Sequence, residues 1–239
     1  EERTHAIEAV LLHWKSLSVP AFRGLNGWRH ERFGVYDNSG SLAFAVERSG
    51  ASLLGSRCYG CHLNGYIRDP ASGQIKMWIA RRSLKKPTHP GALDNIVGGG
   101  LPTGSSPLAN IIKECAEEAG IPDHLASKVT PCGTISYITN NWSDPAKSRN
   151  GFYQDTEYVY DLELSPDFVP QPEDGEVEQF YLWDLDTVKQ HILNGEFVLE
   201  SAFVVIDFLI RHGYLHAGND PHFLEIVTGI HRTLISPGP

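Results

Sequence analysis

The chain has 239 residues, of which 41% are hydrophobic and 21% charged, and this is the composition of a folded globular protein rather than a disordered one. Its formal net charge of −9 disfavours nucleic acid as a partner, because binding to phosphate backbones requires clustered Lys and Arg. No stretch reaches the roughly 18 consecutive apolar residues of a membrane span, so we expect no membrane contact.

The cysteine content and the start of the chain bear on the compartment. Four cysteines are too few for a disulfide scaffold in a chain of this size, which fits a reducing compartment. We therefore expect a cytoplasmic protein, with a removed N-terminal leader left open because the sequence begins with Glu1 and not with Met. The sequence does not fix the oligomeric state, and a homodimer stays open.

Residues 1–52 are predicted to form a small α+β extension. Apolar residues at helical spacing predict a helix over residues 6–17, and Pro20 stops it. Residues 28–36 and 42–46 alternate in polarity, which predicts a hairpin of two short strands.

Residues 53–239 are predicted to form the main domain. Within it, residues 58–62 read CYGCH, a string that matches covalent haem attachment, and its CxxC core also occurs in zinc and redox sites. Haem attachment would require export and an axial partner, and zinc would require a second ligand pair at short spacing. The other two cysteines are far apart, so we interpret Cys58 and Cys61 as small, partly buried thiols beside a strand.

The remaining elements alternate between strands and helices. A helix is predicted to begin at Ser105 or Ser106, with Pro107 in its first turn, and to end at Gly120. The polar segment 140–155 is long enough to shape a pocket. Strands are predicted over residues 60–67, 76–82, 133–139, 156–163 and 178–183, and further helices over residues 186–193, 200–215 and 221–234.

The helix that ends at Gly120 carries Glu114, Glu117 and Glu118 on one face, because residues three and four apart are neighbours on a helix. A solvated acidic stripe is the ordinary explanation of such a run. Here, however, the helix follows the three glycines 98–100, whose backbone comes close to some other group. Carboxylates and a carbonyl, together with phosphate oxygens, are what Mg²⁺ binds, so we interpret the helix as a Mg²⁺ site, with Mn²⁺ as the alternative.

Gly99 followed by residues 113–121, which read KECAEEAGI, resembles the Nudix box in composition and spacing. The resemblance covers residues from about 55 to 215. It implies an α+β protein with the Nudix α/β/α sandwich and a mixed sheet, and a hydrolase that cleaves a diphosphate linkage in a small molecule. Two positions depart from the box: Lys113 replaces the usual Arg, and Ser105 replaces a glutamate, which puts the number of metal ions and the rate in doubt.

The resemblance also implies roles for individual residues. Glu114, Glu117 and Glu118 are the catalytic residues and metal ligands, with Glu114 as a ligand or as the base that deprotonates the attacking water. The carbonyl of Gly98 or Gly99 lies near the metal. A further acidic ligand comes from a later loop, and our candidates are Glu176 and Glu178.

A narrower resemblance spans nearly the whole chain. It is to the Nudix group with an extra N-terminal domain, which includes the Nudix portion of some fungal thiamine pyrophosphokinases and relatives proposed to destroy damaged thiamine diphosphates. The implied reaction removes the terminal phosphate of a thiamine diphosphate analogue and leaves the monophosphate. The matching segments are WRHE (28–31), VER (46–48), YGCHLNGY (59–66), WIARRS (78–83), PGALDN (90–95), DLEL (161–164), DGEVE (174–178) and VIDFLIRHG (205–213).

A thiamine-like ligand needs stacking surfaces, a few polar side chains and cations near its phosphates. Each candidate also has an ordinary explanation: Trp78 as a core residue, His62 as a hydrogen-bonded strand residue, and Lys86 as part of a solvated turn. The candidates for substrate binding are His62, Asn64, Trp78, Arg81, Arg82, Lys86 and, as a lid over the rings, Trp142.

Two other functions stay open. The first is a Nudix hydrolase of another diphosphate, such as a sugar nucleotide, ADP-ribose or a coenzyme A derivative. The second is a degenerate Nudix-fold binding module, which Lys113 and Ser105 suggest. Such a module binds its ligand without metal and turns nothing over.

Overall fold

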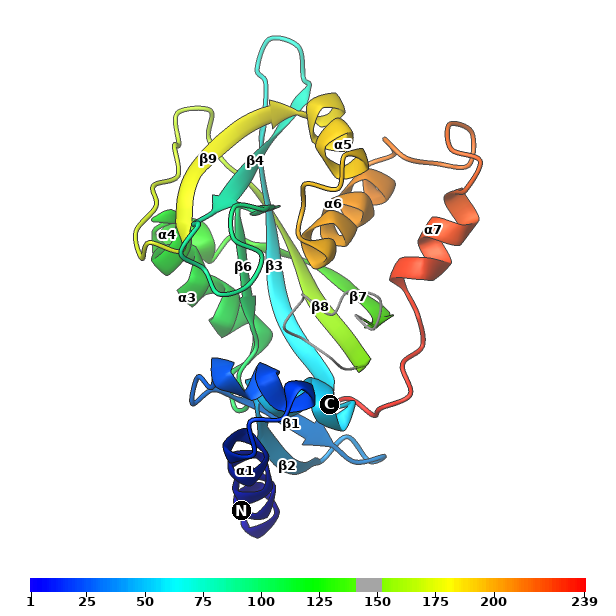
Figure 1. Cartoon of the computed structure of the whole chain (residues 1–239). Helices are drawn as coiled ribbons and strands as arrows, with labels where there is room; N and C mark the ends of the chain where they lie inside the picture. Colours follow the sequence, from blue (N-terminus) through cyan, green and yellow to red (C-terminus); the bar gives the residue numbers. More distant parts are fainter. Residues whose placement is uncertain (141–151) are drawn as a thin grey trace.

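Within residues 1–140 and 152–239, which the computed structural model describes, the centre of the molecule is a seven-stranded mixed sheet (Figure 1). The strand order is β5-β4-β3-β8-β7, with β6 paired to β3 and β9 paired to β4. Strands β3 and β8 run parallel, while the other pairs are antiparallel. The bounds are β3 Arg57–Arg68, β4 Ile75–Arg82, β5 Leu93–Asn95, β6 Val97–Gly100, β7 Thr130–Asn140, β8 Phe152–Glu163 and β9 Val177–Asp184.

Helices cover both faces of this sheet (Figure 1). Ile111 and Cys115 of one helix are fully buried against one face, while Val205 and Phe208 of another are fully buried against the opposite face. The predicted α/β/α sandwich with a mixed sheet is therefore confirmed. The helices are α3 Pro107–Ala119, α4 Asp123–Ala126, α5 Leu185–Leu193, α6 Leu199–Arg211 and α7 Phe223–Ile230.

Local signals set the ends of the helices. The Ser106 side chain accepts a hydrogen bond from the Ala109 N–H, and Gly120 adopts the left-handed conformation (φ 61°), as predicted for the two ends of α3. Helix α6 is shorter than the predicted 200–215, because the chain turns at Gly213 with φ 76°. Helix α7 is likewise shorter than the predicted 221–234.

Residues 1–54, which we call the N-terminal unit, lie at one end of the sheet (Figure 1). Their apolar side chains form a cluster of their own, in which Leu11, Leu25 and Phe33 are buried. The first strand begins at Arg32, later than the predicted residue 28. The elements are α1 Glu2–Ser16, η1 Pro20–Gly27, β1 Arg32–Tyr36, β2 Leu42–Glu47, α2 Arg48–Ala51 and η2 Ser52–Leu54.

Two connections fix the N-terminal unit to the rest of the molecule. The carbonyl of Arg32 accepts hydrogen bonds from the backbone N–H and the hydroxyl of Thr103, which lies in the loop before α3. The Tyr36 ring of β1 packs edge-on against the Tyr59 ring of β3, with the ring centres 5.8 Å apart. Among the described residues, no helix has the length and apolarity that crossing a membrane requires.

Cys58 and Cys61 are free thiols on β3. Side chains alternate along a strand, so two residues three positions apart point to opposite faces of the sheet. These two thiols therefore do not bind one metal ion together.

Candidate functional site

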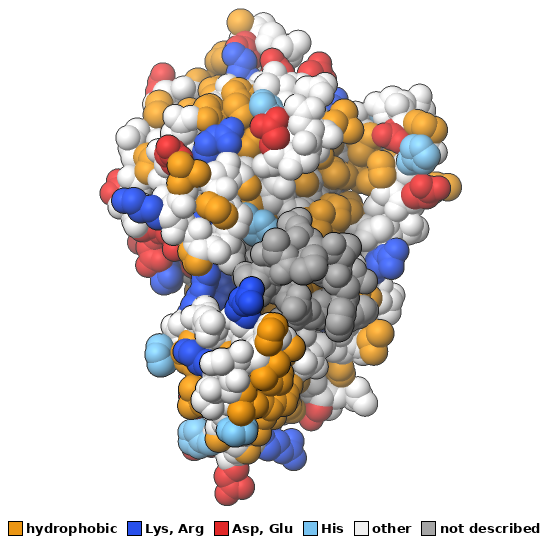
Figure 2. All heavy atoms as spheres, in the orientation of Figure 1, with side chains coloured by type: hydrophobic (Ala, Val, Ile, Leu, Met, Phe, Trp, Pro, Cys, Tyr) orange, Lys and Arg blue, Asp and Glu red, His pale blue; other side chains and the backbone are white. Residues whose placement is uncertain are grey.

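A cleft of ≈ 990 Å³ separates the N-terminal unit from the sheet. Its lining comes from β3, β6, α3 and β8 on one side and from the N-terminal unit on the other. On the face drawn in Figure 2, Lys and Arg side chains gather where the N-terminal unit meets the rest of the molecule. The three glutamates of α3 all line this cleft.

Those three glutamates differ in their surroundings. Glu117 is half exposed and forms an ion pair with Lys113, four residues earlier, at 2.6 Å. The Glu114 side chain is 16% exposed. Glu118 is buried, and its Oε2 accepts a hydrogen bond from the Gly98 N–H at 2.9 Å. The acidic face of α3 is therefore turned largely inward and is not a solvated stripe.

Each of the three consecutive glycines makes room for a different side chain. A Cβ on Gly98 would lie 2.7 Å from Nδ1 of His62, and a Cβ on Gly99 would lie 2.9 Å from the carboxyl carbon of Glu114. A Cβ on Gly100 would lie 3.0 Å from both Arg48 and Phe33 of the N-terminal unit. The groups that approach the backbone of the three glycines, as the sequence predicts, are thus side chains of the cleft itself.

A further carboxylate, Glu157 of β8, reaches the same cleft and was not among the predicted site residues. It lies opposite Gly60 of β3 in the parallel register, and a Cβ on Gly60 would collide with Oε2 of Glu157. This Oε2 is buried and accepts no hydrogen bond from the described residues; Nε2 of His62 lies 3.6 Å away. No local pattern singled it out, because β8 also carries Gln154, Asp155 and Asp161.

The carboxylates in this cleft are electrostatically costly. Burial raises the pKa of Glu118 well above its ordinary value, and the Gly98 N–H opposes the shift only in part. Burial also raises the pKa of Glu157 strongly, with Asp155 and Glu200 adding to it, and it raises the pKa of Glu114. Among the described residues, ten carboxylates and six Lys or Arg side chains line the cleft, so a bound diphosphate requires additional positive charge.

These residues fit a hard divalent cation. The donors are all oxygen atoms, from Glu114, Glu118, Glu157 and the Gly99 carbonyl, and the buried Oε2 of Glu157 is available for coordination. In the described part of the chain, no three His, Cys, Asp or Glu side chains are already gathered at metal-ligand distance. Like charges repel, and a cation is what would draw these carboxylates together. The Mg²⁺ site therefore stays a prediction that the chemistry of the donors supports.

Four of the other predicted residues also line the cleft: His62, Arg82, Lys86 and Glu176. Nη1 of Arg82 donates a hydrogen bond to Asp94 at 2.6 Å. Lys86 and Glu176 form an ion pair with each other. The structure thus places two cations beside the carboxylates, and each of them is already paired.

Four predicted residues do not line the cleft. Asn64 is buried between Asp161 and Asn95, and Trp78 is buried in the core beneath α3. Arg81 donates to the Gly91 carbonyl, because adjacent residues of a strand face opposite ways and only Arg82 turns into the cleft. Glu178 is exposed on β9. Trp142 lies outside the described residues.

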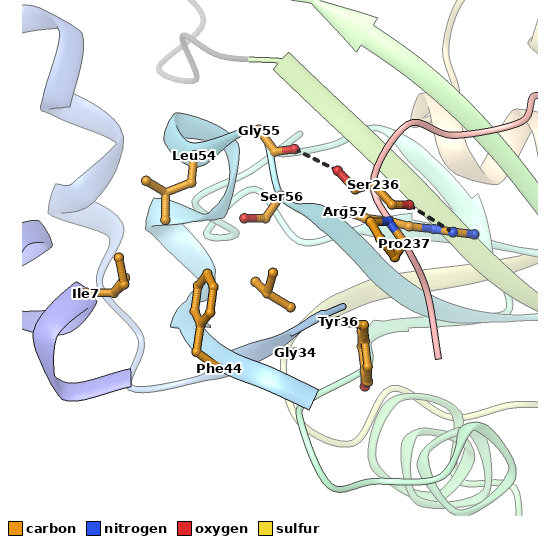
Figure 3. Close-up of a pocket in the computed structure, with 11 residues that line it drawn as sticks. Ile7, Gly34, Tyr36, Phe44, Leu54, Gly55, Ser56, Arg57, Ser236 and Pro237 are labelled. Atoms are coloured by element: carbon orange, nitrogen blue, oxygen red, sulfur yellow. Dashed lines mark hydrogen bonds between the residues drawn. The ribbon is translucent and has the colours of Figure 1, made fainter. Parts of the chain in front are cut away.

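A second, smaller pocket of ≈ 250 Å³ lies between the N-terminal unit and the C-terminal segment (Figure 3). Ile7, Phe44 and Leu54 give it an apolar lining, while Arg57 points away to the Ser236 carbonyl. None of the described residues that line it is a carboxylate. The larger cleft is therefore the candidate active site.

Comparison with known protein families agrees with this geometry. Residues 65–200 match the model of the NUDIX domain. The matched range contains the glycines of β6, the acidic helix α3 and Glu157, while the N-terminal unit lies before it.

Individual relatives resemble almost the whole chain. An uncharacterized protein of Saccharomyces cerevisiae, YJR142W, is 40% identical over 219 residues, which are 90% of this chain and 64% of that protein. Nudix hydrolase 24, chloroplastic, of Arabidopsis thaliana is 38% identical over 228 residues, which are 95% of this chain and 58% of that protein. The chain thus spans about three fifths of the length of these relatives. The predicted cytoplasmic location stays a prediction.

Among solved structures, DR0079 from Deinococcus radiodurans superimposes with a TM-score of 0.52 at 19% identity, covering 74% of this chain and 97% of that one. At this identity the likeness shows the fold alone. It agrees with the mixed sheet and the helices on both of its faces.

Proposed function

Because this chain belongs to the Nudix family, we propose that it is a Mg²⁺-dependent pyrophosphatase that acts on thiamine diphosphate or its damaged analogues. The products are the monophosphate and inorganic phosphate. One observation carries the proposal: the inward face of α3, the glycines of β6 and the buried Glu157 all line one cleft.

The residues that would hold the metal are Glu118, Glu157 and Glu114, with the Gly99 carbonyl beside them and Glu117 at the exposed rim. Mn²⁺, which accepts the same oxygen ligands, is the alternative ion. When bound, the divalent ion neutralises charge on the diphosphate oxygens and on the attacking oxygen.

The chain's own residues contribute binding and proton transfer. Glu114 lies at the edge of the cleft over Gly99, and its raised pKa makes it a better proton acceptor than an ordinary carboxylate. In the proposed step, water oxygen forms a bond to one phosphorus while its proton passes to Glu114. The bond from that phosphorus to the bridging oxygen breaks, and the second phosphate group leaves with the electron pair.

One part of the cleft lining favours a substrate with a cationic ring. Tyr137 and Tyr153 line it together with Asp155 and Glu200, so aromatic surface and negative charge occur side by side. The thiazolium ring of thiamine carries a positive charge, whereas adenine does not. The volume of ≈ 990 Å³ accommodates two rings and a diphosphate.

The experiment is release of phosphate in Mg²⁺ from thiamine diphosphate, its oxidised analogues, ADP-ribose and coenzyme A, with EDTA as the control. Preferential metal-dependent cleavage of the thiamine compounds supports the proposal. Cleavage of the nucleotides alone would keep the pyrophosphatase and discard the substrate. Absence of turnover with all four would instead favour the binding module.

Two matched variants test the site itself. Glu118→Gln removes the charge of a buried cleft carboxylate and is expected to lower kcat about 10³-fold, while the fold is kept. Glu178→Gln changes an exposed carboxylate outside the cleft and is expected to keep wild-type kcat. Full activity in Glu118→Gln would remove α3 from the mechanism.

A further inference from the structure

The N-terminal unit forms a second wall of the cleft, although it precedes the residues that match the NUDIX domain. The side chains that it brings to the cleft include Arg23, Arg29, Glu31, Phe33 and Arg48. Three of these five are arginines, whereas the opposite wall is rich in carboxylates. The arginines of the N-terminal unit are therefore complementary to the diphosphate of a metal–diphosphate complex. The carboxylates of the opposite wall are complementary to its metal ion.

Arg48 is held in place by two side chains of its own unit. Its Nη1 donates to Oε2 of Glu31 at 2.9 Å, and its guanidinium lies over the Phe33 ring, 5.4 Å from the ring centre. In the described part of the chain, the bond to Glu31 is the one hydrogen bond of this guanidinium, and 29% of the side chain stays exposed. Its remaining N–H donors are available to a ligand.

The position of Arg48 relative to the carboxylates is also defined. Its guanidinium packs against Gly100, the residue after the glycine that underlies Glu114. The charge of Arg48 opposes the raised pKa of Glu157, and the charge of Lys86 opposes the raised pKa of Glu118. A cation therefore lies near each of these two carboxylates.

We infer that Arg48 is a substrate-binding residue whose guanidinium holds one phosphate group of the diphosphate, so that the N-terminal unit supplies half of the substrate site. The inference rests on the proposed function for the identity of the ligand. A guanidinium fits phosphate oxygens through two parallel N–H bonds, and an ammonium group lacks this geometry. Glu31 and Phe33 hold the group in place before the ligand arrives.

The first experiment compares Arg48→Gln, Arg48→Lys and Arg32→Gln in Mg²⁺-dependent phosphate release. Arg32 belongs to the same unit, and its side chain pairs with Glu8 outside the cleft, so it controls for loss of a paired arginine. Arg48→Gln is expected to raise KM about 10- to 100-fold with a smaller change in kcat. Arg48→Lys recovers part of the loss, and Arg32→Gln retains wild-type KM.

A second experiment measures binding without turnover. Methylenediphosphonate has a carbon in place of the bridging oxygen, so it is not hydrolysed, and its binding in Mg²⁺ is followed by calorimetry. The expected result is weaker binding by about 10- to 100-fold in Arg48→Gln and unchanged binding in Arg32→Gln. Thermal unfolding of each variant shows whether the fold is kept.

The outcomes separate this inference from the proposed function. Wild-type turnover with equal KM and equal binding in Arg48→Gln and Arg32→Gln would overturn the inference and leave the function standing. Binding that depends on Arg48 in a protein without turnover would support the inference and overturn the enzymatic function. A wild-type protein that neither hydrolyses a diphosphate nor binds methylenediphosphonate would overturn both.

Discussion

Glu47, in the unit that forms one wall of the cleft, and Glu157, in the opposite wall, are both buried, and their hydrogen bonding differs. Glu47 in the N-terminal unit accepts hydrogen bonds from the backbone N–H groups of Arg29 and Ser49, and it caps α2. Glu157 on the sheet has a buried oxygen without a hydrogen bond from the described residues, and burial raises its pKa. A buried carboxylate costs free energy unless it is hydrogen-bonded or paired with a cation.

The difference indicates separate roles for the two walls. The bonds of Glu47 are completed within its own unit, so this residue serves the fold that positions Arg48. Oε2 of Glu157 accepts no hydrogen bond from the described residues, as expected of a residue that acts on a ligand. Variants of the two walls should therefore separate chemistry from binding and stability.

The largest effect is expected from Glu157→Gln. The substitution keeps the shape of the side chain and removes the charge that a metal ligand requires, so we expect kcat to fall about 10²- to 10³-fold. The measurement is phosphate release as a function of Mg²⁺ concentration, with circular dichroism as a check on folding. Wild-type kcat and an unchanged Mg²⁺ midpoint would place Glu157 outside the site.

The next effect concerns stability in EDTA. The folded chain holds protons on Glu118 and Glu157 more tightly than the unfolded chain, in which a glutamate has its ordinary pKa of 4.5. The free energy of unfolding is therefore expected to fall as pH rises above about 4.5, and Mg²⁺ is expected to restore roughly 1–3 kcal/mol at neutral pH. Urea unfolding from pH 5 to pH 8 with EDTA or Mg²⁺ measures both. Stability that rises with pH in EDTA would contradict the expected sign.

The two walls also differ in how far the sequence predicts them. The ends of α3 and the common face of Glu114, Glu117 and Glu118 follow from spacings within one helix, and both were predicted. Glu157 reaches the cleft through the parallel pairing of β3 with β8. Local sequence patterns do not predict the register of two strands that are far apart in the chain. The same limit applies to Arg48, which reaches Gly100 only through the docking of the N-terminal unit.

The substrate residues show a second limit. Trp78 and Arg82 both lie on β4, yet the first is buried in the core and the second lines the cleft. The two residues are four positions apart and share one face of the strand, so composition alone did not tell which part of β4 borders the cleft. Tyr137 and Tyr153 line the cleft and Trp78 does not, because β7 and β8 border the cleft and the middle of β4 does not.

A smaller effect is expected from Glu47→Ala in the N-terminal unit. Loss of the cap leaves the N–H groups of Arg29 and Ser49 without this acceptor, so the free energy of unfolding should fall by about 0.5–2 kcal/mol. Because Glu47 does not line the cleft, kcat of the folded fraction should stay within about twofold of wild type. Urea unfolding and steady-state kinetics on the same preparation check both. Loss of kcat in a fully folded variant would show that the two walls are not separable.

The smallest effect is expected where the two walls touch, in Gly100→Ala. The added Cβ would meet the Arg48 guanidinium and the Phe33 ring edge at 3.0 Å, and the three atoms nearest to it include no carboxylate oxygen. The end of a flexible arginine shifts by a few tenths of an ångström at small cost, so we expect KM to rise about threefold without a change in the Mg²⁺ midpoint. Gly229→Ala in α7, where an added Cβ meets no described atom within 4 Å, is the matched control. A changed Mg²⁺ midpoint in Gly100→Ala would mean that the N-terminal wall also positions the metal ligands. An effect on KM alone would mean that one wall binds phosphate and the other binds the metal.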